Sequence, residues 1–86
     1  MKLQGAVSKE QGITFAVVIV KKQVVDSTAG SRDAISNFTR CFPGMPLVLM
    51  AQDGRGIPTY RGRKDIINFL SNTPLSAIPW KEYSIN

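Results

Sequence analysis

The residues of this chain best suited to bind a charged partner lie between positions 55 and 64. Four cations fall within these ten positions, with one tyrosine among them: Arg55, Tyr60, Arg61, Arg63 and Lys64. Arginine and lysine bind phosphate groups, and an aromatic ring can stack on an unpaired base. The stretch is therefore a candidate interface for RNA or single-stranded DNA, to which Lys21 and Lys22 could add charge. The same residue types also describe a solvated hairpin, because affinity for nucleic acid requires several phosphate contacts on one face.

A second group of polar residues, Ser27, Ser31 and Arg32, could hold an anion. They lie in a predicted loop and at the start of the helix that follows it. Backbone N–H groups at a helix N-terminus attract phosphate or carboxylate groups. Serine also caps helices that bind no ligand, so Ser31 has a second interpretation as a simple N-cap.

Residue types that support catalysis are scarce in this chain. It has no histidine, the side chain most suited to proton transfer near neutral pH and the commonest metal ligand. Cys41 falls among apolar residues of a predicted helix, which favours a buried core cysteine over a nucleophile. Asp53 is interpreted as a turn residue and Asp65 as a favourable charge at a helix N-terminus. We therefore expect no enzymatic activity, no cofactor and no metal site.

Composition and charge are those of a small basic domain. The 86 residues include 11 Lys and Arg against 6 Asp and Glu, which gives a formal charge of +5. This excess favours acidic partners, and it also suits ordinary solubility. The longest apolar run, Phe15 to Val20, is too short to span a bilayer, and the N-terminus lacks the apolar stretch of a signal peptide. A single cysteine cannot form an internal disulfide, so we expect a cytoplasmic protein with no membrane partner.

Hydrophobic periodicity in the first half of the chain predicts two strands and a helix. Lys9 to Gly12 would form the turn of a first hairpin, since the glycine permits a positive φ. From Ile13 to Val20 nearly every residue is apolar, as in a central strand covered on both faces. A helix capped by Ser31 would place Cys41 on its apolar stripe and end at Pro43 and Gly44.

The second half of the chain predicts another hairpin and another helix. A strand from Leu47 to Ala51 would turn at Asp53-Gly54 and return over Ile57 to Tyr60. A helix would follow Gly62, and the tail from Pro74 would form one helical turn and a short final strand. The predicted fold is a single α+β domain over residues 1–86, with a small mixed or antiparallel sheet of four to five strands and two helices.

Pro58, Trp80 and Tyr83 are the residues that we expect to contact another protein. Pro58 lacks a backbone N–H and so marks an edge strand, where a partner strand could pair. Tryptophan and tyrosine are frequent at the centres of protein interfaces, although Trp80 could instead cover the core. The sequence therefore predicts a domain that binds a protein partner or a second copy of itself, with nucleic-acid binding as the alternative.

Residues 15–72 resemble the C-terminal half of a thioredoxin-like fold. The residues that carry the resemblance are Pro46-Leu47-Val48-Leu49-Met50, the Asp53-Gly54 turn, and Gly62 ahead of Ile66, Ile67 and Leu70. The resemblance implies a partly thioredoxin-like sheet and a third alternative, a degenerate redox protein that uses Cys41. The chain has no Cys-x-x-Cys motif, the feature with which such proteins exchange disulfides. The whole chain also resembles small bacterial proteins of unknown function, which implies no chemistry.

Overall fold

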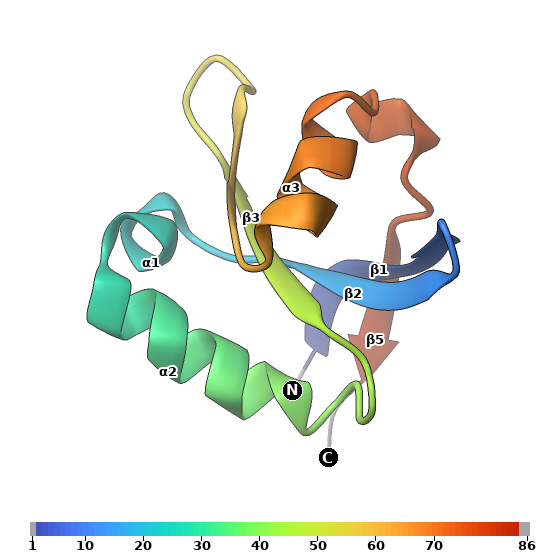
Figure 1. The fold of residues 1–86 in the computed structure, drawn as a ribbon. Coiled ribbons are helices and arrows are strands. Elements are labelled where there is room, and N and C mark those ends of the chain that lie inside the picture. Colours follow the sequence, from blue (N-terminus) through green and yellow to red (C-terminus); the bar gives the residue numbers. More distant parts are fainter. Residues whose placement is uncertain (1, 85–86) are drawn as a thin grey trace.

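Residues 2–84, which the computed structural model describes, form a five-stranded mixed sheet with helices against both faces (Figure 1). The elements are β1 (Lys2–Glu10), β2 (Ile13–Ile19), α1 (Lys22–Asp26), α2 (Thr28–Thr39), β3 (Leu47–Gln52), β4 (Pro58–Arg61), α3 (Lys64–Ser71), the 3-10 turn η1 (Leu75–Ala77) and β5 (Lys81–Ser84). The strand order is β4-β3-β2-β1-β5, with β2 and β3 parallel and the other neighbours antiparallel. This is the predicted α+β class, with the short helix α1 added to the two helices expected.

The first hairpin forms where the sequence predicts it. Gln11 and Gly12 connect β1 to β2 with φ angles of 53° and 79°. A two-residue turn with both φ values positive matches the right-handed twist of the strands that it joins. Pairing then runs from Glu10 opposite Ile13 to Gly5 opposite Val18, where it ends although β1 continues to Lys2.

Two hydrophobic cores lie on opposite faces of the sheet. Because successive strand residues point to opposite faces, Ala16 and Val18 of β2 join one core and Phe15 and Val17 the other. The first core, beside α1 and α2, is Leu3, Ala16, Val18, Val25, Phe42, Leu47, Leu49 and Ala51. The second core, beside α3 and η1, is Ala6, Phe15, Val17, Val48, Met50, Ile66, Leu70 and Ile78. The prediction of a central strand covered on both faces is therefore confirmed.

The connection from β2 to β3 differs from the prediction at its start. Lys22–Asp26 forms the helix α1, where a bent strand and a loop were expected. The cap of α2 is Ser27, whose hydroxyl oxygen accepts a hydrogen bond from the Gly30 N–H at 3.0 Å. The prediction that Ser31 caps this helix is wrong, because Ser31 lies inside α2 and its hydroxyl donates to the Val24 carbonyl at 2.7 Å. This partly buried hydrogen bond joins α2 to α1.

The second hairpin has a five-residue loop, residues 53–57, between β3 and β4. The Asp53 carboxylate accepts hydrogen bonds from the backbone N–H groups of Arg55, at 2.8 Å, and Ile57, at 3.0 Å. The predicted role of Asp53 as a turn residue is confirmed, whereas the positive φ of the loop, 80°, falls at Gly56 and not at Gly54. The strand that follows begins at Pro58 and forms one edge of the sheet, as expected.

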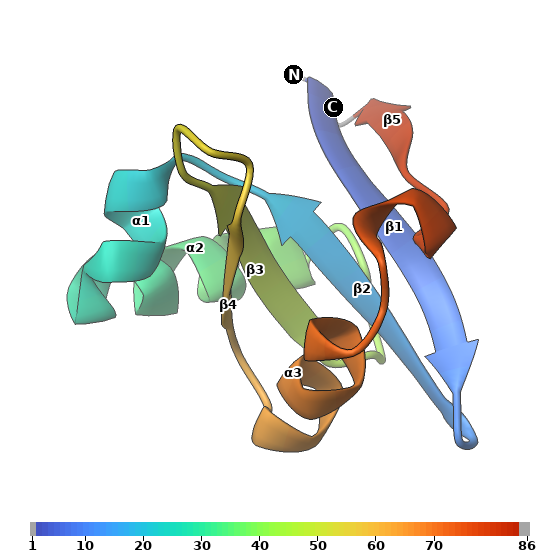
Figure 2. The same ribbon diagram turned by 90° about the horizontal axis from the view of Figure 1, so that it is seen from above.

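The C-terminal segment forms the other edge of the sheet. The predicted helical turn is η1, and the predicted final strand is β5, which pairs antiparallel with β1 from Lys2–Ser84 to Gly5–Lys81. Viewed from above, β1 and β5 lie together at one side of the molecule, while the chain leaving β2 swings away from β1 toward α1 (Figure 2). The first four residues of β1 are therefore paired with β5, while the ladder with β2 reaches only as far as Gly5.

Candidate functional site

The residues of the basic stretch between positions 55 and 64 lie in the hairpin loop, in β4 and at the start of α3. Tyr60 and Arg61 are neighbours on β4, so their side chains point to opposite faces of the sheet. Tyr60 packs against the second core, whereas the Arg61 Nε donates to the Val25 carbonyl of α1 at 2.7 Å. The tyrosine and this arginine therefore do not share the single surface on which a base would stack and a phosphate would bind.

The remaining cations of the stretch are exposed. Arg63 donates two hydrogen bonds to the Asp65 carboxylate, at 2.6 and 3.1 Å. Arg63 lies immediately before α3, and Asp65 lies in the first turn of that helix. The Arg63 hydrogen bond lowers the pKa of Asp65, and the same pair raises the pKa of Arg63. Arg55 lies in the hairpin loop and Lys64 at the first position of α3, so these cations occupy different elements.

The Tyr60 hydroxyl group is an unusual feature of the second core. Its oxygen is buried and has no hydrogen-bond partner among the described residues. Burial disfavours the charged phenolate, which raises the pKa of Tyr60. Such an unsatisfied group lowers stability because it loses its hydrogen bonds to water on folding.

Replacing Tyr60 with phenylalanine is expected to raise the free energy of unfolding by about 1 kcal/mol, the cost of an unsatisfied buried hydroxyl. Because the pKa is higher in the folded state, wild-type stability falls as the pH rises above about 10, where the unfolded tyrosine ionises. Tyr60→Phe lacks this loss. Urea unfolding at pH 7 and pH 10.5 measures both effects, and a variant less stable than wild type at pH 7 would contradict the first.

Both serine hydroxyl groups of the second predicted anion site form hydrogen bonds within the protein. The Ser27 hydroxyl oxygen accepts from Gly30 and the Ser31 hydroxyl donates to Val24, as described above, and Ser31 is buried. Arg32 is exposed on α2. The two serines thus have structural roles in capping α2 and joining it to α1.

The residues predicted to contact a protein partner are half-buried. The Trp80 Nε1–H donates to the Leu75 carbonyl at 3.0 Å, and the ring packs on the second core. The Tyr83 ring meets Phe42 edge to face, with centroids 5.2 Å apart, and Lys81 lies 5.1 Å from the Tyr83 centroid. Each aromatic ring therefore covers one face of the sheet, and Pro58 is half-buried at the opposite edge.

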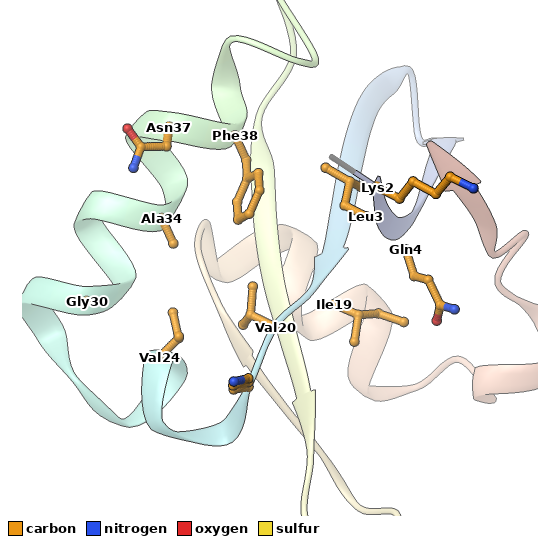
Figure 3. A pocket seen from close by; sticks show the side chains of 11 residues that line it. Lys2, Leu3, Gln4, Ile19, Val20, Val24, Gly30, Ala34, Asn37 and Phe38 are labelled. Carbon is orange, nitrogen blue, oxygen red and sulfur yellow. The ribbon is translucent and has the colours of Figure 1, made fainter. Parts of the chain in front are cut away.

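An open groove of about 810 Å³ lies between β1 and α2, at the end of the sheet where β2 leaves β1. Apolar side chains make up most of its lining: Leu3, Ile19, Val20, Val24, Ala34 and Phe38. Figure 3 shows Ala34 and Phe38 pointing from α2 into the space that faces β1. This apolar groove is the site that the structure adds to the sequence-based candidates.

The polar residues of the groove are Lys2, Gln4, Lys21 and Asn37, with no carboxylate among them. Lys2 forms an exposed ion pair with Glu82, at 3.5 Å. Lys22 is paired with Asp26 at 2.7 Å, whereas Lys21 has no carboxylate within 4 Å in residues 2–84. Of the cations named from the sequence, Lys21 alone lines this groove.

Other residues considered for chemistry lie apart from the groove. Cys41 follows the end of α2, so its predicted place on the helix is wrong, and it packs half-buried against the first core. Within the part of the chain that the structure describes, no three acidic or cysteine side chains lie close enough to hold a metal ion. None of the helices in residues 2–84 has the length and apolar character needed to cross a membrane.

No family model matches this chain, and comparison with curated proteins and with solved structures finds no match.

Proposed function

We propose that this protein is a non-enzymatic binding domain that holds an apolar segment of another protein in the groove between β1 and α2. The observation that carries the proposal is the groove itself, with an apolar lining and a volume of about 810 Å³. Contiguous apolar surface that remains open to solvent in a folded domain is typical of an interaction site. Because the groove is open along one side, it suits a segment of a larger molecule.

The walls of the groove come from elements that are held firmly by the rest of the fold. Ser31 joins α2 to α1, and Arg61 joins α1 to β4 through the Val25 carbonyl. On the other side, β1 is fixed by its pairing with β5. A groove with walls that are ordered before binding loses less conformational entropy when a partner enters.

A selection of peptides from a random displayed library tests the proposal. Peptides enriched on the wild-type protein are expected to lose at least about tenfold in affinity for Ala34→Glu, because a carboxylate in an apolar groove must be desolvated when the peptide binds. Asn37→Glu, at an exposed position of the same lining, provides a second variant should Ala34→Glu fail to fold.

Ser36→Glu is the matched control, because Ser36 is an exposed residue of α2 that does not line the groove. It adds the same charge to the same helix and is expected to leave peptide affinity unchanged. Failure to enrich any peptide, or enriched peptides that bind Ala34→Glu and Asn37→Glu as well as wild type, would overturn the proposal.

A further inference from the structure

We infer that the segment held in the groove is an extended, acidic peptide strand that pairs its backbone with Lys2–Gln4 of β1. The inference rests on the proposed function and specifies the conformation and charge of the bound segment. Three observations support it: a length of β1 that is not paired on the side of β2, a groove lining drawn from both faces of the sheet, and an excess of positive charge in that lining.

The backbone of β1 is available for pairing on the side that faces the groove. The ladder with β2 ends at Gly5 opposite Val18, while Lys2–Gln4 pair only with β5 on their other side. The N–H and C=O groups of alternate strand residues point to alternate sides. At least one residue of Lys2–Gln4 therefore directs both backbone groups toward the groove, where an added strand could bond to them.

The strand that would otherwise occupy this place has turned away. After Ile19 the chain leaves β1, and the Val20 N–H donates to the Met50 carbonyl of β3 at 2.8 Å. Figure 2 shows this divergence between β1 and the connection to α1. Lys2–Gln4 of β1 therefore have no strand beside them on the side from which β2 departs.

The lining of the groove draws on both faces of the sheet. Leu3 and Val20 belong to the face of the first core, whereas Ile19 packs against the second core. An extended segment sends alternate side chains to opposite faces and can contact both sets. A helix presents one apolar stripe and would contact only the face that α2 covers. The arrangement thus favours a strand.

The charge of the groove indicates the chemistry of the partner. Lys2 and Lys21 line it, and its described lining contains no carboxylate. The ion pair between Lys2 and Glu82 is exposed and therefore weak, so a carboxylate of the partner can compete for Lys2. The bound segment is expected to carry Asp or Glu at positions that lie beside these two lysines, which would also speed its association.

The peptides selected on the wild-type protein provide the probe for this inference. Each enriched peptide is synthesised with N-methyl groups placed singly along its backbone, because N-methylation removes one donor without changing the side chains. An extended pairing predicts losses of about tenfold at alternate positions and small effects between them, since only alternate N–H groups bond to β1. A helical peptide would instead lose affinity at consecutive positions.

Charge is tested with Lys21→Glu, and Lys9→Glu is the matched control at an exposed site outside the groove. We expect about a tenfold loss for Lys21→Glu, none for Lys9→Glu, and weaker wild-type binding in high salt. Two results would overturn this inference and leave the proposed function standing. In the first, peptides lose affinity for Ala34→Glu but keep it when their backbone is N-methylated. In the second, peptides bind Lys21→Glu with the same affinity as wild type. Absence of any enriched peptide would overturn both.

Discussion

Replacing Gly5 with alanine is expected to lower the free energy of unfolding by about 3 kcal/mol, the upper part of the range for forcing extra atoms into a packed interior. A Cβ atom at Gly5 would lie 2.5 Å from the Val17 carbonyl oxygen, well inside van der Waals contact. That carbonyl cannot retreat easily, because Val17 is fully buried and β2 is paired with β3 opposite Val48. Relief requires β1 to move away from β2.

Urea unfolding monitored by Trp80 fluorescence measures this change. Gly54→Ala is the matched control, because a Cβ atom there meets nothing within 4 Å, and the change is expected to stay within about 0.5 kcal/mol, as for most surface substitutions. Equal stability of Gly5→Ala and wild type would show that β1 and β2 do not approach so closely. The ladder between β1 and β2 ends at Gly5, beside the groove, so the substitution also perturbs one wall of the groove.

Leu49→Ala is expected to cost about 3 kcal/mol, within the range for removing a buried leucine side chain. Leu49 is fully buried in the first core, in the middle of β3, between Val18 on one side and Arg61 on the other. A rigid sheet cannot collapse into the cavity that the shorter side chain leaves. For a domain of this size, the loss corresponds to a fall in Tm of roughly 12 °C or more.

Thermal unfolding followed by circular dichroism measures the effect of Leu49→Ala. Ile57→Ala removes a comparable apolar side chain from an exposed site, since Ile57 is 51% exposed in the hairpin loop, and Tm is expected to change little. Similar Tm values for the two variants would contradict the assignment of Leu49 to the centre of the first core. The contrast tests packing, because the two residue types have nearly the same size.

The strands that the sequence predicted are those in which periodicity and turn residues agree. Ile13–Ile19 has almost continuous apolar residues beside a Gln-Gly turn, and the structure buries it on both faces. The helix α1 was missed because it has only five residues, too few for a helical period to show. Ser27 and Ser31 both precede apolar residues at helical spacing, so sequence alone did not distinguish the cap from the residue four positions later.

The candidate sites were harder to predict, because they depend on where neighbouring elements place each side chain. Tyr60 and Arg61 are adjacent in sequence, and only their position on a strand sends them to opposite faces. The predicted strand ended at Tyr60, so the sequence analysis left both side chains in one candidate interface, whereas β4 extends to Arg61. The groove had no such signal, because it results from β1 extending beyond the point where β2 turns away.

The pairing of Lys2 with Ser84 has a mechanical consequence. These residues face each other at one end of the ladder between β1 and β5. A force that pulls them apart acts along the hydrogen bonds, which lie perpendicular to antiparallel strands. The bonds would then break one after another, from Lys2–Ser84 inward to Gly5–Lys81. In this direction the ladder between β1 and β5 is lost one residue pair at a time.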